Sequence, residues 1–342
     1  MEKPGDGKKR VGVIGAGSWG TALANLLGER ESVDLWVFEE DLFEAMAKER
    51  ENRVFLPGVR LVDGIGLTHS LEEAFAGKDI LVCALPSHAV REVFSRGQPF
   101  LPEGILIVSA TKGLENKSHQ PASKILREIT VRGRKTKIAC LSGPSFAREV
   151  ARQLPTAVAV AGTNSEAARM AQELFSRPYF RVYTNPDLVG VELGGAIKNV
   201  MAIAAGAADG LGFGHSSRAA LITRGLAEMT RLGVKMGADA RTFSGLAGLG
   251  DLILTCTGDL SRNRSVGLEL GKGRALAGIL GEMKMVAEGV RTTQAVWELG
   301  QQMKVEMPIV KKVHEILYEG KDPRNAVGEL MSRRPRGELD RL

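Results

Sequence analysis

The sequence predicts an α/β protein: an N-terminal parallel sheet domain, covered by helices on both faces, followed by an all-helical C-terminal domain. Two observations predict this fold class. From residue 11 to about 185, short apolar runs alternate with helical stretches, as in a parallel sheet with helical connections. After Asp187 the strand-like runs disappear, and Ala, Gly, Leu and Met recur at helical spacing. We therefore predict two domains, 1–187 and 188–342.

Seven short apolar runs are predicted to be the strands of the sheet. Pro86 ends one of them, and the Gly143-Pro144 pair breaks another. A helix of small residues is predicted over 21–27, and one long buried helix over 187–211 opens the second domain. The predicted strands are 11–14, 33–38, 79–86, 104–109, 137–141, 156–162 and 180–184.

The composition is that of an ordinary globular protein. The chain has 342 residues, of which 44% are hydrophobic and 25% charged. The net charge is +6, but the basic residues are dispersed among 40 acidic ones, and aromatic residues make up only 5%. Sparse aromatics and scattered charge disfavour a nucleic-acid surface. We expect an anionic small-molecule ligand instead.

The cysteines and the N-terminal stretch predict a cytoplasmic protein. Cys83, Cys140 and Cys256 form no CxxC pair, and their odd number argues against a disulfide framework. The first two lie in apolar strand-like runs, where buried reduced thiols are expected. Residues 1–10 are polar and precede no signal-peptide core, and no stretch approaches the ~20 apolar residues of a membrane span. The five His residues lack metal-ligand spacing, so no metal is expected.

One stretch near the N-terminus has the pattern of a strand, a glycine-rich turn and a helix. Gly15 permits the tight turn, Gly17 lets a pyrophosphate approach the backbone, and Gly20 lets the helix pack on the strand. The helix beginning near Ser18 points free N–H groups at that pyrophosphate. Glu39, about 20 residues further on, can accept the ribose hydroxyls. The pattern predicts a Rossmann-type dinucleotide-binding domain; the alternative is a βαβ unit without a ligand.

Several polar positions outside this motif are also candidates for function. Lys112 follows a predicted strand at its carboxyl end, where ligands bind in open α/β folds. Lys198 lies inside an apolar helix, where a charge is costly unless it is paired or used. Ser145 and the polar cluster 261–264 could hold an anion or simply cap helices. Asp251 could be a functional carboxylate, a helix N-cap, or both.

Together these motifs resemble the bacterial-type NAD(P)-dependent glycerol-3-phosphate dehydrogenases over residues 10–331. The resemblance implies reversible hydride transfer between a nicotinamide cofactor and the pair dihydroxyacetone phosphate and sn-glycerol 3-phosphate. It also implies a metabolic role, the supply of glycerol 3-phosphate for phospholipid synthesis. In chain order, the matching motifs are 15–24, 109–115, 142–147, 198–199, 248–252, 261–263 and 288–293.

The resemblance implies a role for each matching residue. Lys198 looks like the proton donor and acceptor, Lys112 like a second active-site lysine, and Asp251 like the carboxylate that orients the lysine or a substrate hydroxyl. The residues that resemble substrate contacts, several of them around the phosphate, are Lys112, Gly143, Ser145, Lys198, Asp251, Thr255, Ser261, Arg262 and Asn263. The residues that resemble cofactor contacts, besides the three glycines and Glu39, are Ser18, Trp19, Lys112, Ala147, Arg262, Val286 and Glu288.

The implied chemistry suits a lysine. Ketone reduction needs a hydride on one face and a proton on the developing alkoxide, and an ammonium group can supply that proton. A free lysine has a pKa of ~10.4, too high for reversible work near neutral pH. Burial and a second cation nearby would lower the pKa of Lys198, whereas Asp251 would raise it.

The turn after the second predicted strand departs from many relatives, which carry a basic residue there for the 2′-phosphate of NADP. Here the strand ends in Phe38, and Glu39, Glu40 and Asp41 follow. Three carboxylates would repel a phosphate and suit free ribose hydroxyls. We therefore predict NAD as the preferred cofactor, with NADP as the alternative.

Two other functions stay open. One is a related two-domain dehydrogenase acting on a hydroxy acid of the ketopantoate or phosphogluconate type. The other is a non-catalytic NAD(H)-binding redox sensor with a protein partner, although a sensor would need neither lysine nor Asp251. The apolar helices of the second domain could also bury a homodimer face.

Overall fold

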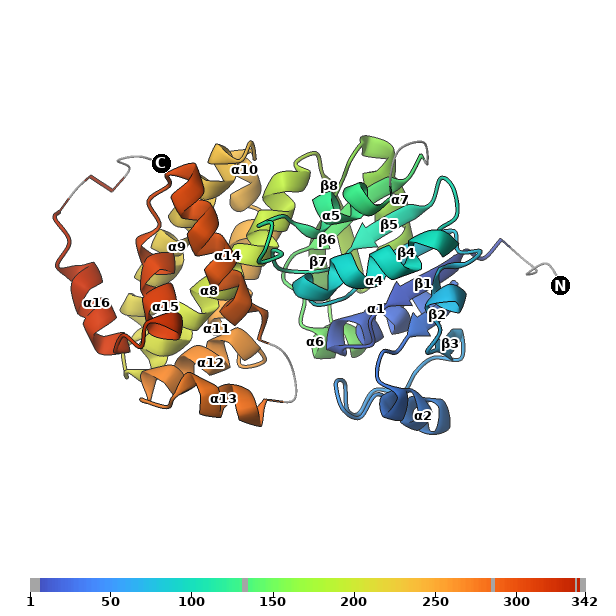
Figure 1. Cartoon of the computed structure of the whole chain (residues 1–342), viewed down its shortest axis with the longest axis horizontal. Coiled ribbons are helices and arrows are strands. Elements are labelled where there is room, and N and C mark those ends of the chain that lie inside the picture. The colour runs from blue at the N-terminus through green and yellow to red at the C-terminus, as the bar shows by residue number, and fades with distance from the viewer. Residues whose placement is uncertain (1–6, 131–134, 284–286, 336, 339–342) are drawn as a thin grey trace. The chain divides into compact units, whose positions relative to one another are not determined.

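The structure is a computed structural model that describes residues 7–130, 135–283, 287–335 and 337–338. The chain forms two compact units (Figure 1). Unit 1 consists of the chain up to Thr111 together with Ala122–Leu141 and Ser145–Leu188. Unit 2 consists of Val189–Leu342 and two short segments, Lys112–Pro121 and Ser142–Pro144, that the sequence analysis placed in the first domain.

Unit 1 contains an eight-stranded sheet with the strand order β3-β2-β1-β4-β5-β6-β7-β8. The pairs β1–β2, β2–β3, β1–β4, β4–β5, β5–β6 and β7–β8 are parallel. The strand order reverses between β1 and β4, and this is the point where open parallel sheets bind ligands. The strands are β1 Arg10–Ile14, β2 Ser32–Trp36, β3 Ile65–Thr68, β4 Ile80–Cys83, β5 Leu106–Ser109, β6 Lys137–Ser142, β7 Thr156–Gly162 and β8 Phe180–Asn185.

All seven predicted strands are present, and the predicted fold class is confirmed. Strand β3 was not predicted; it is an edge strand of only four residues whose second residue is Gly66. Glycine is unfavourable in strands and the run is short, so periodicity gives no signal there. Cys83 and Cys140 lie on β4 and β6 and are buried free thiols, as predicted.

Side chains of the strands alternate between two apolar cores, one on each face of the sheet. On β4, Ile80 and Val82 belong to one core, and Leu81 and Cys83 to the other. Helices α1 and α7 contribute to the first core, and α3, α4 and α5 to the second. The helical elements of unit 1 are α1 Ser18–Gly28, α2 Glu40–Glu49, α3 Leu71–Phe75, η1 Ser87–Ala89, α4 Val90–Gly97, η2 Gln98–Phe100, α5 Ala122–Ile129, α6 Ala147–Ala151 and α7 Ser165–Phe175.

The regular elements described in unit 2 are helices packed around α8, which begins and ends within one residue of the predicted 187–211 helix. Leu193, Ile197 and Val200 of α8 share one apolar core with residues of α9, α14 and α15. The elements, coloured yellow-green to red in Figure 1, are α8 Leu188–Gly210, α9 His215–Lys235, α10 Ala240–Phe243, the π-helical turn η3 Leu246–Gly250, α11 Asp251–Thr257, α12 Arg262–Gly271, α13 Leu276–Glu282, α14 Glu288–Met303, α15 Pro308–Tyr318 and α16 Pro323–Met331.

Helix α8 is also the only helix among the described residues that is long and apolar enough to cross a membrane. The prediction that no stretch approaches the length and apolarity of a membrane span is therefore wrong for this helix. However, 83% of its most apolar window is buried inside the protein. The helix is apolar because it is rich in glycine and alanine, and these small residues let neighbouring helices pack closely against it.

Candidate active site

The glycine-rich turn of unit 1 has the geometry expected of a pyrophosphate site. Gly15 has a φ of +112°, a backbone conformation that residues other than glycine rarely adopt. A Cβ on Gly20 would lie 1.8 Å from the carbonyl oxygen of Gly15, so only glycine fits there. A Cβ on Gly17, by contrast, would meet no atom of the described residues within 4 Å. None of these residues therefore requires glycine at position 17, whereas a ligand that approaches the backbone would.

The first turn of α1 offers further donors beside this open space. Gly17 is the N-cap residue and makes no side-chain cap bond, and Ser18 and Trp19 follow as the first helical residues. The indole N–H of Trp19 is buried, and no hydrogen-bond acceptor reaches it among the described residues. Ala147 begins α6, a helix that contacts α1. These groups fit an anionic dinucleotide, because buried donors are normally satisfied by a partner.

Glu39 is exposed and is the N-cap residue of α2. It lies two residues after Val37, whose backbone N–H makes the last hydrogen bond from this segment to β3, at the carbonyl of Thr68. Glu40 and Asp41 form the acidic first turn of that helix and are also exposed. The three carboxylates are therefore free to act on a ligand at the carboxyl end of β2.

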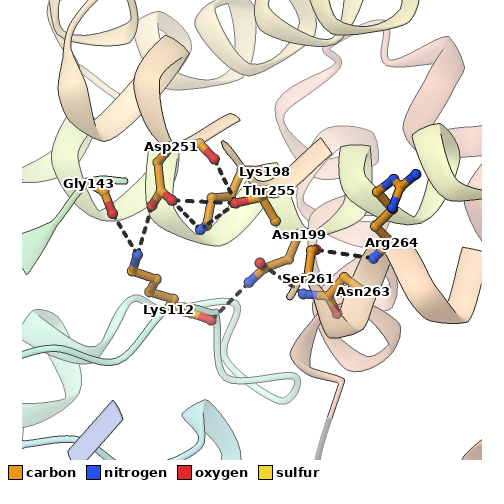
Figure 2. A network of polar contacts seen from close by, with 9 residues as sticks. All are labelled: Lys112, Gly143, Lys198, Asn199, Asp251, Thr255, Ser261, Asn263 and Arg264. Atoms are coloured by element: carbon orange, nitrogen blue, oxygen red, sulfur yellow. Dashed lines mark hydrogen bonds and ion pairs between the residues drawn. The ribbon is translucent and has the colours of Figure 1, made fainter. Parts of the chain in front are cut away.

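Unit 2 contains a polar cluster in which two lysines share one buried carboxylate (Figure 2). Asp251, at the start of α11, is fully buried. Its Oδ1 accepts a hydrogen bond of 2.5 Å from Lys198 Nζ, and its Oδ2 accepts one of 2.8 Å from Lys112 Nζ. Lys198 also donates to Thr255 Oγ1 over 2.8 Å, and Lys112 donates to the carbonyl of Gly143 over 3.0 Å.

The buried position of Lys198 lowers its pKa to about 7. Desolvation is the largest cause, and the positive charge of Lys112 lowers it further, while the charge of Asp251 opposes both effects. The shift has the direction expected from the sequence. Lys198 can therefore both release and accept a proton near neutral pH.

The N-cap interpretation of Asp251 is wrong. Asp251 is the first residue of α11, and the cap position belongs to Gly250, in the π-helical turn η3 that runs directly into the helix. Because no cap bond occupies it, the Asp251 carboxylate can serve the two lysines. One turn later, the Thr255 hydroxyl donates to the main-chain carbonyl of Asp251 over 2.6 Å and is thereby oriented to accept from Lys198.

Two asparagines connect the lysine pair to the polar cluster on α12 (Figure 2). Asn199 donates to the main-chain carbonyl of Lys112 over 3.3 Å and accepts from Asn263 over 3.0 Å. Asn263 in turn accepts from the backbone N–H of Gly289 at the start of α14. Asn199 belongs to the sequence motif 198–199, but this bridging role was not predicted.

The remaining candidates lie at the ends of helices. Ser261 is the N-cap of α12 and accepts from the N–H of Arg264, so its capping interpretation is confirmed. Ser145 is not a cap, because Phe146 holds that position in α6. Arg262 is exposed at the start of α12, yet partial desolvation lowers the pKa of its guanidinium below the ordinary value, and the charge of Glu288 opposes this shift. Val286 lies outside the described residues.

A sheet with a glycine-rich turn at its switch point, joined to a helical unit with a buried lysine that titrates near neutral pH, defines a two-domain nicotinamide-dependent dehydrogenase. The family models agree with this class and narrow it. The model of the NAD-dependent glycerol-3-phosphate dehydrogenase N-terminus matches residues 10–168, and that of the C-terminus matches residues 187–328. The chain belongs to the NAD-dependent glycerol-3-phosphate dehydrogenase family.

Individual relatives resemble the chain over nearly its whole length. The glycerol-3-phosphate dehydrogenase [NAD(P)+] of Geobacter metallireducens is 56% identical over 331 residues, covering 96% of this chain and 99% of the relative. That of Myxococcus xanthus is 50% identical over the same shares. The crystal structure of glycerol-3-phosphate dehydrogenase from Coxiella burnetii superimposes with a TM-score of 0.92 at 41% identity, covering 95% of this chain and 99% of the other.

Proposed function

We propose that this chain reversibly transfers a hydride between NAD(P)H and dihydroxyacetone phosphate, forming sn-glycerol 3-phosphate for phospholipid synthesis, with Lys198 as the proton donor and acceptor. The observation that carries the proposal is the geometry of Lys198, a buried ammonium held by Asp251 and Thr255 with a pKa of about 7. A nicotinamide cofactor bound at the glycine-rich turn would supply the hydride for the carbonyl carbon. As that carbon is reduced, the carbonyl oxygen takes a proton from Lys198.

The other residues bind and orient the substrate in this proposal. Asp251 holds both lysines in place by hydrogen bonds to its two oxygens. Lys112 provides a positive charge that stabilises the developing alkoxide. Gly143, Ser145 and the α12 segment 261–263 contact the substrate, and the last of these offers guanidinium and amide donors to its phosphate. The direct test is to follow NADH absorbance with dihydroxyacetone phosphate; absence of turnover despite cofactor binding would favour a sensor or another substrate.

The pH dependence of the reaction should follow Lys198. Reduction needs the ammonium form, so kcat/KM for dihydroxyacetone phosphate is expected to fall as the pH rises through about 7. Oxidation of glycerol 3-phosphate needs the neutral amine, so its kcat/KM should rise over the same interval. Initial rates in both directions from pH 5 to 9 check this. The phosphate group of both substrates titrates near pH ~6, so the effect of Lys198 is the change with opposite sign in the two directions. Parallel changes in the two directions would contradict the assignment.

We also propose that NAD is preferred over NADP, because Glu39, Glu40 and Asp41 lie exposed after β2. Juxtaposed like charges cost several kcal/mol, so we expect kcat/KM for NADH to exceed that for NADPH by at least about tenfold. Glu39→Arg should reduce the ratio of kcat/KM for NADH to kcat/KM for NADPH, mainly by lowering KM for NADPH. Glu44→Arg, on an exposed position of the same helix α2, is the matched control and should leave the ratio unchanged. Equal efficiencies in the unaltered protein would contradict the preference.

Oligomeric state and location belong to the same proposal. Apolar side chains exposed on unit 2 support a homodimer, and three buried free cysteines support a reducing compartment, the cytoplasm. Light scattering of the purified protein measures the oligomeric state directly. The exposed large apolar residues of unit 2 are Val234, Ile253, Leu260, Leu280, Tyr318 and Met331.

A further inference from the structure

Helices α8 and α12 contact each other through their backbones. A Cβ on Gly206 of α8 would lie 2.0 Å from the carbonyl oxygen of Arg264, and a Cβ on Gly267 of α12 would lie 2.0 Å from that of Ile203. Gly210 and Gly271 continue the same contact one turn further along each helix, against the carbonyls of Leu268 and Ala207 at 2.2 and 2.3 Å. Because the obstructing atoms belong to the main chain, no side-chain rotation could make room. The contact therefore fixes the spacing of the two helices.

Asp209 holds three helices together at this contact. It lies on α8, and its side chain is only 6% exposed. Its Oδ1 accepts from Arg218 of α9, with Nε at 2.9 Å. Its Oδ2 accepts from Arg264 of α12, with Nε and Nη2 both at 2.9 Å. Both oxygens of one buried carboxylate are thus used by guanidinium groups from two other helices, an arrangement with strong geometric preference.

Arg264 transmits this constraint to the polar segment of α12. Its carbonyl rests against Gly206, its guanidinium is held by Asp209, and its N–H donates to Ser261 Oγ over 3.2 Å. The residues in between are Arg262 and Asn263. A residue held at both its main chain and its side chain leaves the first turn of α12 little freedom to rotate. The donors of that turn are therefore oriented before any ligand binds.

We propose that Asp209 is a positioning residue for substrate binding, acting through Arg264 to hold Ser261, Arg262 and Asn263 in place for the substrate phosphate. This rests on the proposed function, which assigns those three residues to the substrate. Asp209 makes no hydrogen bond to Lys198 or Asp251 among the contacts of the described residues, so the proton-transfer group does not depend on it. Loosening α12 should weaken binding of the phosphate and leave proton transfer intact.

The test is Asp209→Asn, which keeps the shape of the side chain but removes its charge and one acceptor. We expect KM for dihydroxyacetone phosphate to rise about tenfold while kcat stays within about twofold. The affinity for NADH, measured by fluorescence titration, should not change. With dihydroxyacetone, which lacks the phosphate, kcat/KM should equal that of the unaltered protein. A merely structural role would lower the efficiency with both substrates alike.

Asp259→Asn is the matched control, because Asp259 also pairs with Arg264, over 3.0 Å, but its side chain is 96% exposed. An exposed ion pair contributes little, so this variant should behave like the unaltered protein. If Asp209→Asn does not fold, the second variant is Arg264→Lys, which keeps the positive charge but loses the two guanidinium nitrogens that contact Asp209. It should give the same selective rise in KM for dihydroxyacetone phosphate. Unchanged KM in a folded variant, or equal losses with both substrates, would overturn the inference. Failure of the unaltered protein to reduce dihydroxyacetone phosphate would instead refute the proposed function, and this inference with it.

Discussion

Lys198→Met is expected to lower kcat for dihydroxyacetone phosphate reduction about a thousandfold, because it removes the proton donor. Methionine is unbranched like lysine, lacks only the terminal ammonium group and suits the apolar surroundings of α8, so the helix should remain packed. Asp251 keeps its hydrogen bond from Lys112 and is not left as an unpaired buried charge. The measurement is single-turnover reduction under saturating NADH, which reports the chemical step.

The matched control for this variant is Lys137→Met, since Lys137 is a partly exposed lysine on β6 that pairs with Glu166. It should leave kcat within about twofold, as a surface ion pair contributes little. Binding of NADH should be the same in both variants, because no cofactor role is proposed for either lysine. Turnover of Lys198→Met near that of the unaltered protein would remove Lys198 from the mechanism.

The glycines of the turn after β1 provide a second large effect, in which stability and binding separate. Gly20→Ala would place its Cβ 1.8 Å from the Gly15 carbonyl, and overpacking of this kind costs about 3 kcal/mol of folding free energy. The Cβ of Gly17→Ala would meet no atom of the described residues, and the φ of −68° is one that alanine adopts readily, so only the loss of a favourable N-cap residue, about 1 kcal/mol or less, should affect its stability. Its Cβ would nevertheless occupy the space for the pyrophosphate. We expect at least a tenfold weaker affinity for NADH, or about 1.4 kcal/mol.

Thermal unfolding without ligand and NADH titration check the two halves of this prediction. Gly58→Ala is a useful reference for stability, because Gly58 also has open space but a φ of +80°. Its cost reflects backbone strain alone and should be about 1 kcal/mol. If Gly17→Ala bound NADH as tightly as the unaltered protein, the open space at Gly17 would not be the pyrophosphate site.

The fold could be predicted from the sequence where local patterns are strong. Buried parallel strands such as β4 and β5 are continuous apolar runs, and α8 is long and free of breakers, so their positions were predicted within a few residues. The edge strand β3 was missed because Gly66 and partial exposure hide its periodicity. The assignment of 112–121 and 142–144 to unit 2 could not be predicted either, since only long-range contacts determine which unit a loop joins.

The site was predictable as single residues and not as an arrangement. Lys198 stands out because a charge inside an apolar helix needs a reason, and Asp251 because it is the one carboxylate in its window. That Asp251 binds both Lys198 and Lys112 depends on packing between segments far apart in the chain. Asp209 gave no signal, because acidic residues near helix ends are common on any surface, and Arg264 stood out only as a member of the polar cluster 261–264.

The assignment of two loop segments to unit 2 also bears on how members of this family could exchange parts. A recombination joint between residues 187 and 188 would give Lys112 from one parent and Asp251 from the other. Leu114, part of the helical core, would likewise come from the parent that supplied the sheet. A functional chimera should therefore take residues 112–121 and 142–144 from the same parent as the helices. Because these segments lie within the sheet domain in sequence, the two units cannot be exchanged by a single crossover although the chain folds as two compact bodies.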